Sequence, residues 1–225
     1  MKKNKRRASR RSRRIRRRLF LNYQSRQKKK KSKPSKKLSK IELFENTVRK
    51  ISFFAFQYGL ETSKIKFEEI GKNKAKTDNF FSKCHEGWAI AQKLIVAEIL
   101  KVEKEQTLLK VNLKEARKNR EKEVEKEIQR NTNFSNFKVD VLRSIGSAIG
   151  WTILQGQTHI IRRLFLEESP PTLSTSNLGS VIKKVDEINN GNPLEFALIA
   201  DITNFIQIGD ILHKGIDSIQ YVEMK

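Results

Sequence analysis

The C-terminal stretch "GDILHKGIDSIQYVEMK" (residues 209–225) decides how we interpret the fold of this chain. Two runs in which apolar and polar residues alternate, 209–214 and 218–225, flank a short group of turn-forming residues, and this pattern predicts a β-hairpin. If the loop has an even number of residues, Asp210 pairs with Glu223, and directly paired residues project from the same face of a sheet. The spacing therefore predicts two carboxylates together on one surface of the hairpin.

This pair of carboxylates predicts a site for a divalent cation. Directly paired carboxylates repel each other, so the hairpin is destabilised unless something neutralises them. Mg²⁺ characteristically takes one or two carboxylates and keeps waters or substrate phosphate in its other positions. The two-residue period of a strand puts Lys225 on the face of Glu223, where it could orient or help deprotonate a metal-bound water. Two alternatives stay open: an odd-length loop would send Asp210 to the opposite face, and the hairpin could be a solvated element with ordinary charges.

Residues 209–212 and 221–225 also resemble the signature of the PD-(D/E)XK nuclease superfamily. In that superfamily an Asp begins one strand and a Glu-X-Lys lies on the next. A helix upstream of them often supplies a further metal-binding Glu, which here would be Glu195 or Glu187. The resemblance covers roughly 178–225 and stops at the Glu-X-Lys motif. It therefore implies the front half of a core that continues, in the family, with a helix and another strand.

The resemblance implies a catalytic set consisting of Asp210, Glu223 and Lys225. Asp210 and Glu223 would bind Mg²⁺ (or Mn²⁺), the backbone carbonyl of Met224 would complete the coordination, and Lys225 would assist the attacking water. Gly209 stands where the family has a proline. The implied reaction is the hydrolysis of phosphodiester bonds by a metal-activated water.

The N-terminal segment 1–40 differs in composition from the rest of the chain. It holds 21 of the 48 Lys and Arg residues and none of the 25 Asp and Glu residues. Such a segment has too few apolar groups to offset the entropy of ordering, so we expect a disordered tail. Its charges predict binding to nucleic acid, because each Lys or Arg that displaces a condensed counterion strengthens the association. A tail that only keeps the protein soluble is the alternative. The residues expected to bind nucleic acid are Arg6, Arg7, Arg10, Arg11, Arg13, Arg14, Arg16, Arg17, Arg18, Lys28, Lys29, Lys30 and Lys31.

The region 41–166 is expected to be mainly helical. Apolar residues at three- and four-residue steps predict helices over 41–60, about 80–130, 138–154 and 159–166, with breaks at 71–79 and 131–137. On the last of these helices Arg162 and Arg163 could touch phosphate, although a solvated face is the commoner explanation. The longest helix carries the a/d spacing of a coiled-coil seam. The seam residues are Ile95, Ile99, Val102, Gln106, Leu109, Leu113 and Ala116. The favoured interpretation is an amphipathic helix packed in its own domain, and the alternative is a homodimer, or a helical hairpin with a partner segment, through this helix.

The C-terminal quarter of the chain begins with a linker. Adjacent prolines and Ser, Thr and Asn residues at 167–177 prevent regular structure, and 178–190 then predicts a short helix. Residues 192–206 are ambiguous. The order Asn192-Pro193-Leu194-Glu195 has the form of an N-cap, a first-turn proline and an N3 glutamate, which favours a helix. The β-branched and aromatic residues at 199–206 would instead suit a central strand.

Together these elements predict an α+β fold in four parts: a basic disordered tail (1–40), a mainly helical region with one long helix (41–166), a linker (167–177) and a partial nuclease-like α/β core with a β-hairpin (178–225). The single cysteine, Cys84, excludes an intrachain disulfide and favours a reducing compartment. The sequence has no apolar run of the length that a membrane span needs. We therefore expect a cytoplasmic protein associated with nucleic acid and not with a membrane.

The favoured function is a metal-dependent nuclease, acting on DNA rather than RNA, in which the tail holds the nucleic acid and the hairpin cleaves it. The alternative is a non-catalytic nucleic-acid-binding protein that uses its tail. A coiled-coil interaction protein whose tail binds acidic partners comes third. His85, His159 and His213 are interpreted as structural or solvated, because none has the spaced partners of a zinc site.

Overall fold

The computed structural model describes residues 39–166, 171–216 and 218–224. The predicted tail therefore lies almost wholly outside the described residues. The chain divides into two compact units, 1–43 and 44–225.

In the first unit, the described residues contain the start of helix α2 (Lys40–Phe56). The amide of Ser39 donates to Oε2 of Glu42 at 2.7 Å, and the amide of Glu42 donates to Oγ of Ser39 at 3.2 Å. This reciprocal pair is a capping box, in which two side chains satisfy amides that the first turn of a helix leaves without partners. It fixes the start of the helix that was predicted over 41–60.

In the second unit, α2 ends at Phe56 and a short helix, α3 (Tyr58–Ser63), follows it. The next long helix begins at Lys74, where the side chain of Asn73 accepts a hydrogen bond from the amide of Lys76 at 3.1 Å. The break predicted over 71–79 is therefore wrong beyond residue 73. Its polar side chains are those of a helix N-terminus, which favours Asn as the capping residue.

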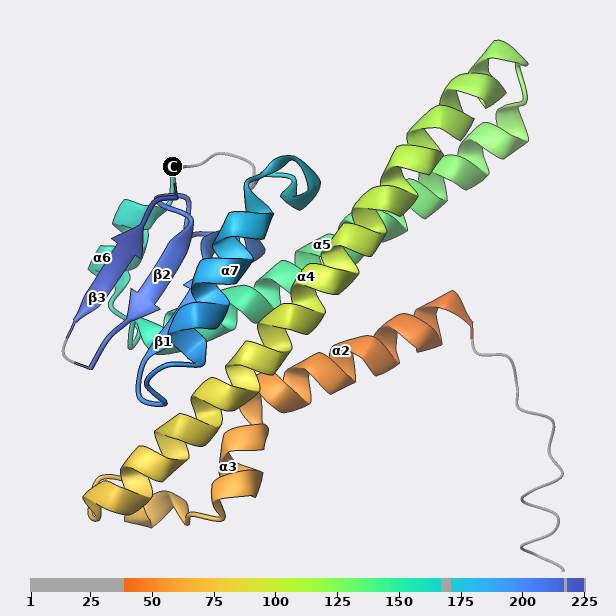
Figure 1. Cartoon of the computed structure of the whole chain (residues 1–225). Coiled ribbons are helices and arrows are strands. Elements are labelled where there is room, and N and C mark those ends of the chain that lie inside the picture. Colours follow the sequence, from red (N-terminus) through yellow and green to blue (C-terminus); the bar gives the residue numbers. More distant parts are fainter. Residues whose placement is uncertain (1–38, 167–170, 217, 225) are drawn as a thin grey trace, which may run out of the picture. The chain divides into compact units, whose positions relative to one another are not determined.

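Two long helices form the largest part of the second unit. α4 (Lys74–Lys118) and α5 (Lys122–Ile153) lie side by side as a helical hairpin (Figure 1). The chain reverses over 119–121, where Arg120 takes a positive φ of 60° and the amide of Glu121 donates to the carbonyl of Ala116 at 2.9 Å. The helix predicted over about 80–130 is therefore two helices separated by this turn.

The break predicted over 131–137 is also wrong, because these residues lie inside α5. Asn, Thr and Ser lower the stability of a helix only slightly, and tertiary packing easily overrides such a preference. Here Ser135 is buried, and the rings of Phe134 and Phe44 meet edge to face with centroids 6.2 Å apart. The predicted helix over 138–154 is the C-terminal half of the same element.

The a/d seam of α4 packs against α5 of the same chain. Ile95, Ile99 and Val102 are buried, and further along the hairpin the side-chain amide of Gln106 donates to Oδ1 of Asn136 at 2.9 Å. The favoured interpretation, an amphipathic helix packed in its own domain, agrees with these contacts.

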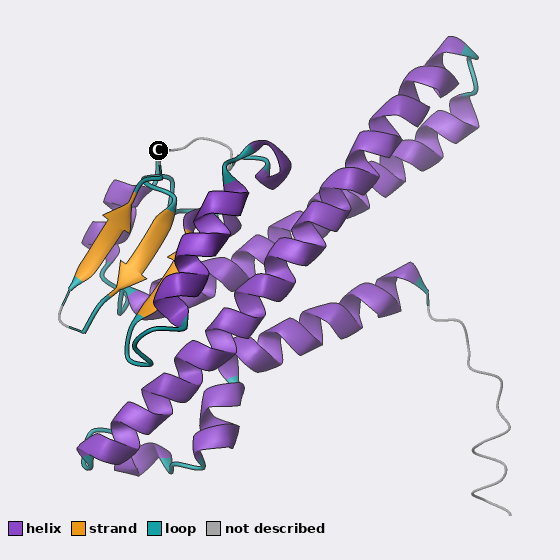
Figure 2. Cartoon of the chain, viewed as in Figure 1, coloured by secondary structure: helices purple, strands orange, loops and turns teal. Residues whose placement is uncertain are grey.

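The strands and the short helices that follow α5 lie beside this hairpin (Figure 2). In chain order after α5 they are α6 (Thr158–Leu164), the 3₁₀ turn η2 (Leu173–Thr175), α7 (Leu178–Asn189), β1 (Phe196–Ile199), the 3₁₀ turn η3 (Ala200–Ile202), β2 (Ile211–Lys214) and β3 (Ile219–Val222); a further 3₁₀ turn, η1 (Phe67–Glu69), precedes α4. The three strands form one antiparallel sheet in the order β1-β2-β3. The predicted α+β fold is confirmed, and so are the helices predicted over 159–166 and 178–190.

The register of the C-terminal hairpin is the one that an even-length loop predicts. Leu212 pairs with Tyr221 and Lys214 pairs with Ile219, so a four-residue loop, 215–218, joins β2 to β3. A slip of one residue would have moved every side chain of the strand to the other face. The parity on which the paired carboxylates depend is therefore confirmed.

The helix predicted over 192–206 is wrong, and a strand takes its place. The amide of Leu194 donates to the side chain of Asn192 at 3.0 Å, and the amide of Glu195 donates to the carbonyl of Asn192 at 3.0 Å. Asn-Pro is thus used in a tight turn, a role it shares with helix starts. All four residues of β1 that follow are buried although β1 is an edge strand, and the local capping pattern does not reveal this burial.

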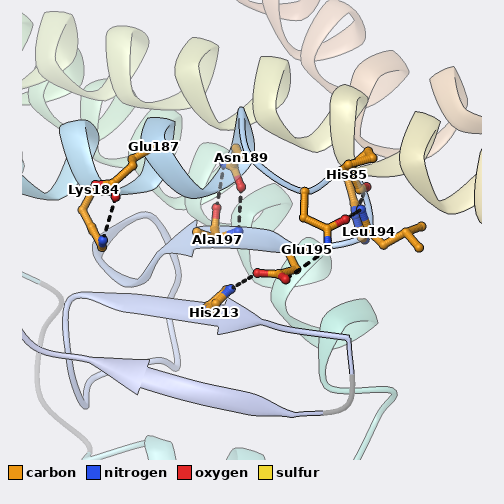
Figure 3. Close-up of polar contacts among 10 residues, drawn as sticks. His85, Lys184, Glu187, Asn189, Leu194, Glu195, Ala197 and His213 are labelled. Carbon is orange, nitrogen blue, oxygen red and sulfur yellow. Dashed lines mark hydrogen bonds and ion pairs between the residues drawn. The ribbon is translucent and has the colours of Figure 1, made fainter.

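Side-chain amides cover the outer edge of β1. The amide of Ala197 donates to Oδ1 of Asn189 at 2.7 Å, and Nδ2 of Asn189 donates back to the carbonyl of Ala197 at 3.1 Å (Figure 3). Gln92 of α4, itself buried, donates to the same carbonyl at 3.1 Å and accepts from the amide of Ile199 at 3.3 Å. The backbone groups that a neighbouring strand would satisfy are therefore satisfied by two amide side chains.

The helical hairpin holds the turn that follows β1 at close range. A Cβ atom at Gly146 of α5 would lie 2.3 Å from the carbonyl oxygen of Ile202 in η3, so only glycine allows this approach. α4 and α7 both pack against β1. The position of η3, and of Asp201 within it, is thus set by the packing of α5 against the sheet.

Candidate site at the start of strand β2

Asp210 stands directly before β2 and is held by main-chain hydrogen bonds on both sides. Its amide donates to the carbonyl of Val222 at 2.9 Å, and its carbonyl accepts from the amide of Ala200 at 2.9 Å. Its carboxylate Oδ2 accepts a hydrogen bond from the amide of Met224 at 2.6 Å. A short bond from an amide to a charged acceptor orients the carboxylate strongly.

Gly209 precedes Asp210 and takes a backbone conformation that proline cannot adopt. Gly209 has a φ of 73°, a left-handed conformation that glycine adopts without strain. Proline fixes φ near −65° and could not take this conformation. The glycine lets the chain turn into β2 while passing close to the carbonyl of Val222, 3.3 Å from where a Cβ atom would stand.

A second carboxyl group, that of Asp201, joins Asp210 from η3. The bond between Ala200 and Asp210 brings the two segments together. Burial raises the pKa of Asp201, the negative charge of Asp210 raises it further, and the nearby Ser176 hydroxyl and the charge of Arg143 partly oppose both effects. No local pattern points to this residue, because Asp201 lies inside the segment 192–206, for which a helix is predicted.

Glu223 follows β3 and is exposed. The paired register ends at Ile211 and Val222, and the amide of Asp210 also donates to the carbonyl of Val222, so the predicted direct pairing of Asp210 with Glu223 is not formed. Met224 lies beside Asp210 through its amide, as described above. Lys225, the expected helper of the attacking water, lies outside the described residues.

Glu195 and Glu187, the two upstream acids that the resemblance suggested, do not join Asp210. Glu195 precedes β1, whose first residue pairs with the last residue of β2, so it lies at the opposite end of the ladder from Asp210. Its Oε2 contacts Nε2 of His213 at 3.1 Å (Figure 3). Glu187 of α7 forms an exposed ion pair with Lys184 at 3.2 Å.

A buried charged pair supports the site from the helical hairpin. Glu103 of α4 accepts hydrogen bonds from the amides of Leu173 and Ser174, at 2.8 and 2.9 Å. Arg143 of α5 donates from Nη2 to the carbonyl of Pro171 at 2.5 Å, and burial lowers its pKa against the opposing charges of Asp201, Glu103 and Asp140. These bonds fix the described part of the predicted linker, which carries Ser176 to Asp201.

The donor set suits a hard cation such as Mg²⁺ (or Mn²⁺). Asp201, Asp210 and Glu223 offer carboxylate oxygens, and Mg²⁺ is commonly held by one or two carboxylates with waters or phosphate oxygens completing an octahedron. Among the residues that the structure describes, no group of three or more His, Cys, Asp or Glu side chains is arranged to enclose a metal ion. The described carboxylates are therefore of the type that Mg²⁺ prefers, but they do not form an assembled metal site.

The predicted nucleic-acid-binding residues of the tail, Arg6 to Lys31, lie outside the described residues. Within the part of the chain that the structure describes, no helix combines the length and the apolar character needed to cross a membrane.

Comparisons with family models, with curated proteins and with solved structures found no match to this chain.

Proposed function

We propose that this protein is a metal-dependent nuclease that hydrolyses phosphodiester bonds of nucleic acid, DNA in preference to RNA. One observation carries the proposal: the carboxyl groups of Asp201 and Asp210 are drawn together at the start of β2. Carboxylates gathered in this way repel each other, and a divalent cation with oxygen ligands relieves the repulsion. The resemblance of 209–225 to the PD-(D/E)XK signature supports the same chemistry.

In the proposed reaction, bound Mg²⁺ (or Mn²⁺) would lower the pKa of a water and offset charge on the scissile phosphate. Asp210 suits the role of principal ligand because the amide of Met224 holds one carboxylate oxygen, while the other accepts no hydrogen bond from a described residue. Glu223 supplies a second carboxylate from the neighbouring strand, and Asp201 a third that can hold a metal-bound water. Lys225 is assigned by resemblance to orient the attacking water.

The substitution Asp210→Asn tests this function directly. Asn keeps an oxygen that can accept from Met224 but loses the charge that binds the ion, so we expect Mg²⁺-dependent cleavage to fall by about 100-fold or more. Binding of the same nucleic acid should be unchanged. Cleavage is measured on plasmid and on labelled single strands, and binding by fluorescence anisotropy in Ca²⁺.

Asp78→Asn, on α4 far along the helix from the sheet, is the matched control and should cleave like the wild type. Equal cleavage by the wild type and Asp210→Asn would contradict the nuclease function, and so would a wild type that cleaves nothing with Mg²⁺ or Mn²⁺.

The second candidate is a non-catalytic protein that binds nucleic acid through its tail. The observation in its favour is the 21 Lys and Arg residues in 1–40 with no acidic residue among them. Binding by the tail needs none of the carboxylates at β2. A homodimer through α4 belongs to neither candidate, because the buried part of its seam packs against α5 of the same chain. For both candidates we propose a cytoplasmic, nucleic-acid-associated location.

A further inference from the structure

The last turn of α6 presents two arginines to solvent. Ile161 and Leu164 face the core and are buried, whereas Arg162 and Arg163 between them are exposed. Neither guanidinium forms an ion pair with another residue of the described ranges. Two cations that form no ion pair in the described part of the chain are available to a ligand.

Within the end of α5 and the whole of α6, no acidic side chain balances this positive charge. No Asp or Glu occurs between 141 and 166, a stretch that contains the end of α5 and the whole of α6. The next acidic residues, Glu167 and Glu168, lie outside the described residues. A cluster of unbalanced arginines attracts phosphate groups, for which the planar guanidinium has matching geometry.

An exposed aromatic ring follows the arginines directly. The residue after α6, Phe165, is 46% exposed, and Leu166 next to it is 53% exposed. Exposed aromatic rings beside Arg residues are typical of surfaces on which unpaired bases stack while the cations hold the backbone. Each stacked base contributes about 1–3 kcal/mol by alanine substitution in known cases.

Two hydrogen bonds tie the end of α6 to the chain that leads into the candidate site. The amide of Gln207 donates to the carbonyl of Leu164 at 2.9 Å, and Oε1 of Gln207 accepts from the amide of Leu166. Asp210 is three residues further on, a path of at most about 11 Å. The surface formed by Arg162, Arg163 and Phe165, here called the α6 surface, is therefore connected to Asp210 by a short segment of chain.

We propose that the α6 surface binds a single strand of nucleic acid and leads it to Asp210. A single strand is favoured over a duplex because Phe165 can stack only on a base that is not already stacked inside a helix. The direction toward Asp210 rests on the proposed nuclease function, whereas the binding itself does not. This surface would add a defined contact to the unspecific attraction of the tail.

Photo-crosslinking of the full chain tests the proposal without interference from the tail. A single strand of about 15 nucleotides, the upper range of one binding module, carries 5-bromouracil and is irradiated with the protein in Ca²⁺. Digestion at lysine gives the peptide 139–183 from the wild type and from all variants, and mass spectrometry assigns the crosslinked residue. We expect crosslinks both in the tail and at Phe165.

Arg162→Gln/Arg163→Gln should lower the yield at Phe165 about fivefold or more while the tail crosslinks persist. Lys110→Gln/Lys114→Gln removes the same charge from the distal part of α4 and should leave the yield at Phe165 unchanged. Crosslinks confined to the tail, or an unchanged yield in the arginine variant, would overturn the proposal. An equal yield from the matching duplex would overturn its single-strand part.

The wild type and Asp210→Asn together separate this inference from the nuclease function. A crosslink at Phe165 in a wild type that shows no Mg²⁺-dependent cleavage supports the α6 surface and contradicts the nuclease. Cleavage that is lost in Asp210→Asn, without any crosslink at Phe165 in either protein, does the reverse.

Discussion

The carboxyl group of Asp201 is surrounded by less water and more negative charge than a carboxyl group on an open surface. Burial, and then the charge of Asp210, raise its pKa above the ordinary value of 3.8. A group whose pKa is raised by folding contributes stability at low pH, and that contribution is lost as the pH rises through the folded-state pKa. Ionised Asp201 therefore destabilises the fold at neutral pH when no cation is present.

The first prediction follows from the direction in which the contribution of Asp201 to stability changes with pH. Without divalent cations, Asp201→Asn should raise the melting temperature at about pH 7, and the advantage should shrink as the pH falls and disappear below about pH 4. Adding Mg²⁺ should stabilise the wild type more than the variant, because a cation that binds only the folded protein raises its stability. Thermal melts followed by circular dichroism measure both effects. A variant that melts below the wild type at neutral pH would show that this carboxylate stabilises the fold.

Single residues also set the limit of what the sequence could predict about the site. Asp210 and Glu223 were predicted as site residues because strand alternation and hairpin parity depend only on spacing. Asp201 could not be predicted in this way, because its place depends on how α5 packs against η3 through Gly146. Glu195 was assigned by resemblance, yet its position depends on the register between β1 and β2, which no local pattern specifies.

At the scale of single elements, strand β1 depends on Gln92 from another part of the chain. Gln92 is 1% exposed and supplies both a donor and an acceptor to the edge of β1. The second prediction is that Gln92→Leu lowers the free energy of unfolding by about 1–3 kcal/mol, because it leaves the buried amide of Ile199 without a partner. Urea denaturation measures the loss.

Gln106→Leu is the control for this prediction. Gln106 lies on the same helix and also forms a side-chain hydrogen bond, but to the side chain of Asn136 in an exposed position. Its loss should cost well under about 1 kcal/mol. Equal effects of the two substitutions would mean that the edge of β1 is not stabilised by the buried amide.

The elements that sequence predicted well are those whose signal is periodic. α6, α7 and the hairpin of β2 and β3 carry clear apolar spacing, and each was predicted close to its observed bounds. The helix boundaries were predicted wrongly where short groups of polar residues were interpreted as helix breaks. Asn and Thr residues inside α5 did not stop the helix, whereas the turn at 119–121 lies in a charged run that looks fully helical.

For the molecule as a whole, charge is concentrated in 1–40, which holds 21 of the 48 basic residues and no acid. The third prediction is that removing residues 1–38 flattens the salt dependence of nucleic-acid binding. Each phosphate contact on a single strand contributes a slope of about −0.7 to the dependence of log K on log salt, so the loss should be large. The truncation keeps Ser39 and its capping box.

Fluorescence anisotropy over a series of KCl concentrations gives the slopes for the full chain and the truncated one. Lys110→Gln/Lys114→Gln in the full chain serves as the control and should leave the slope nearly unchanged. An unaltered slope after truncation would assign the binding to the described residues instead of the tail.

The amide side chains along β1 have a further consequence, for strand addition. Asn189 and Gln92 already occupy the outward backbone groups of β1, so an extended peptide would have to displace a buried amide to pair there. At the opposite edge, no hydrogen bond from another described residue occupies the outward backbone groups of β3. An extended peptide could therefore add to this sheet only along β3. β3 is the neighbour of β2, the strand that Asp210 directly precedes.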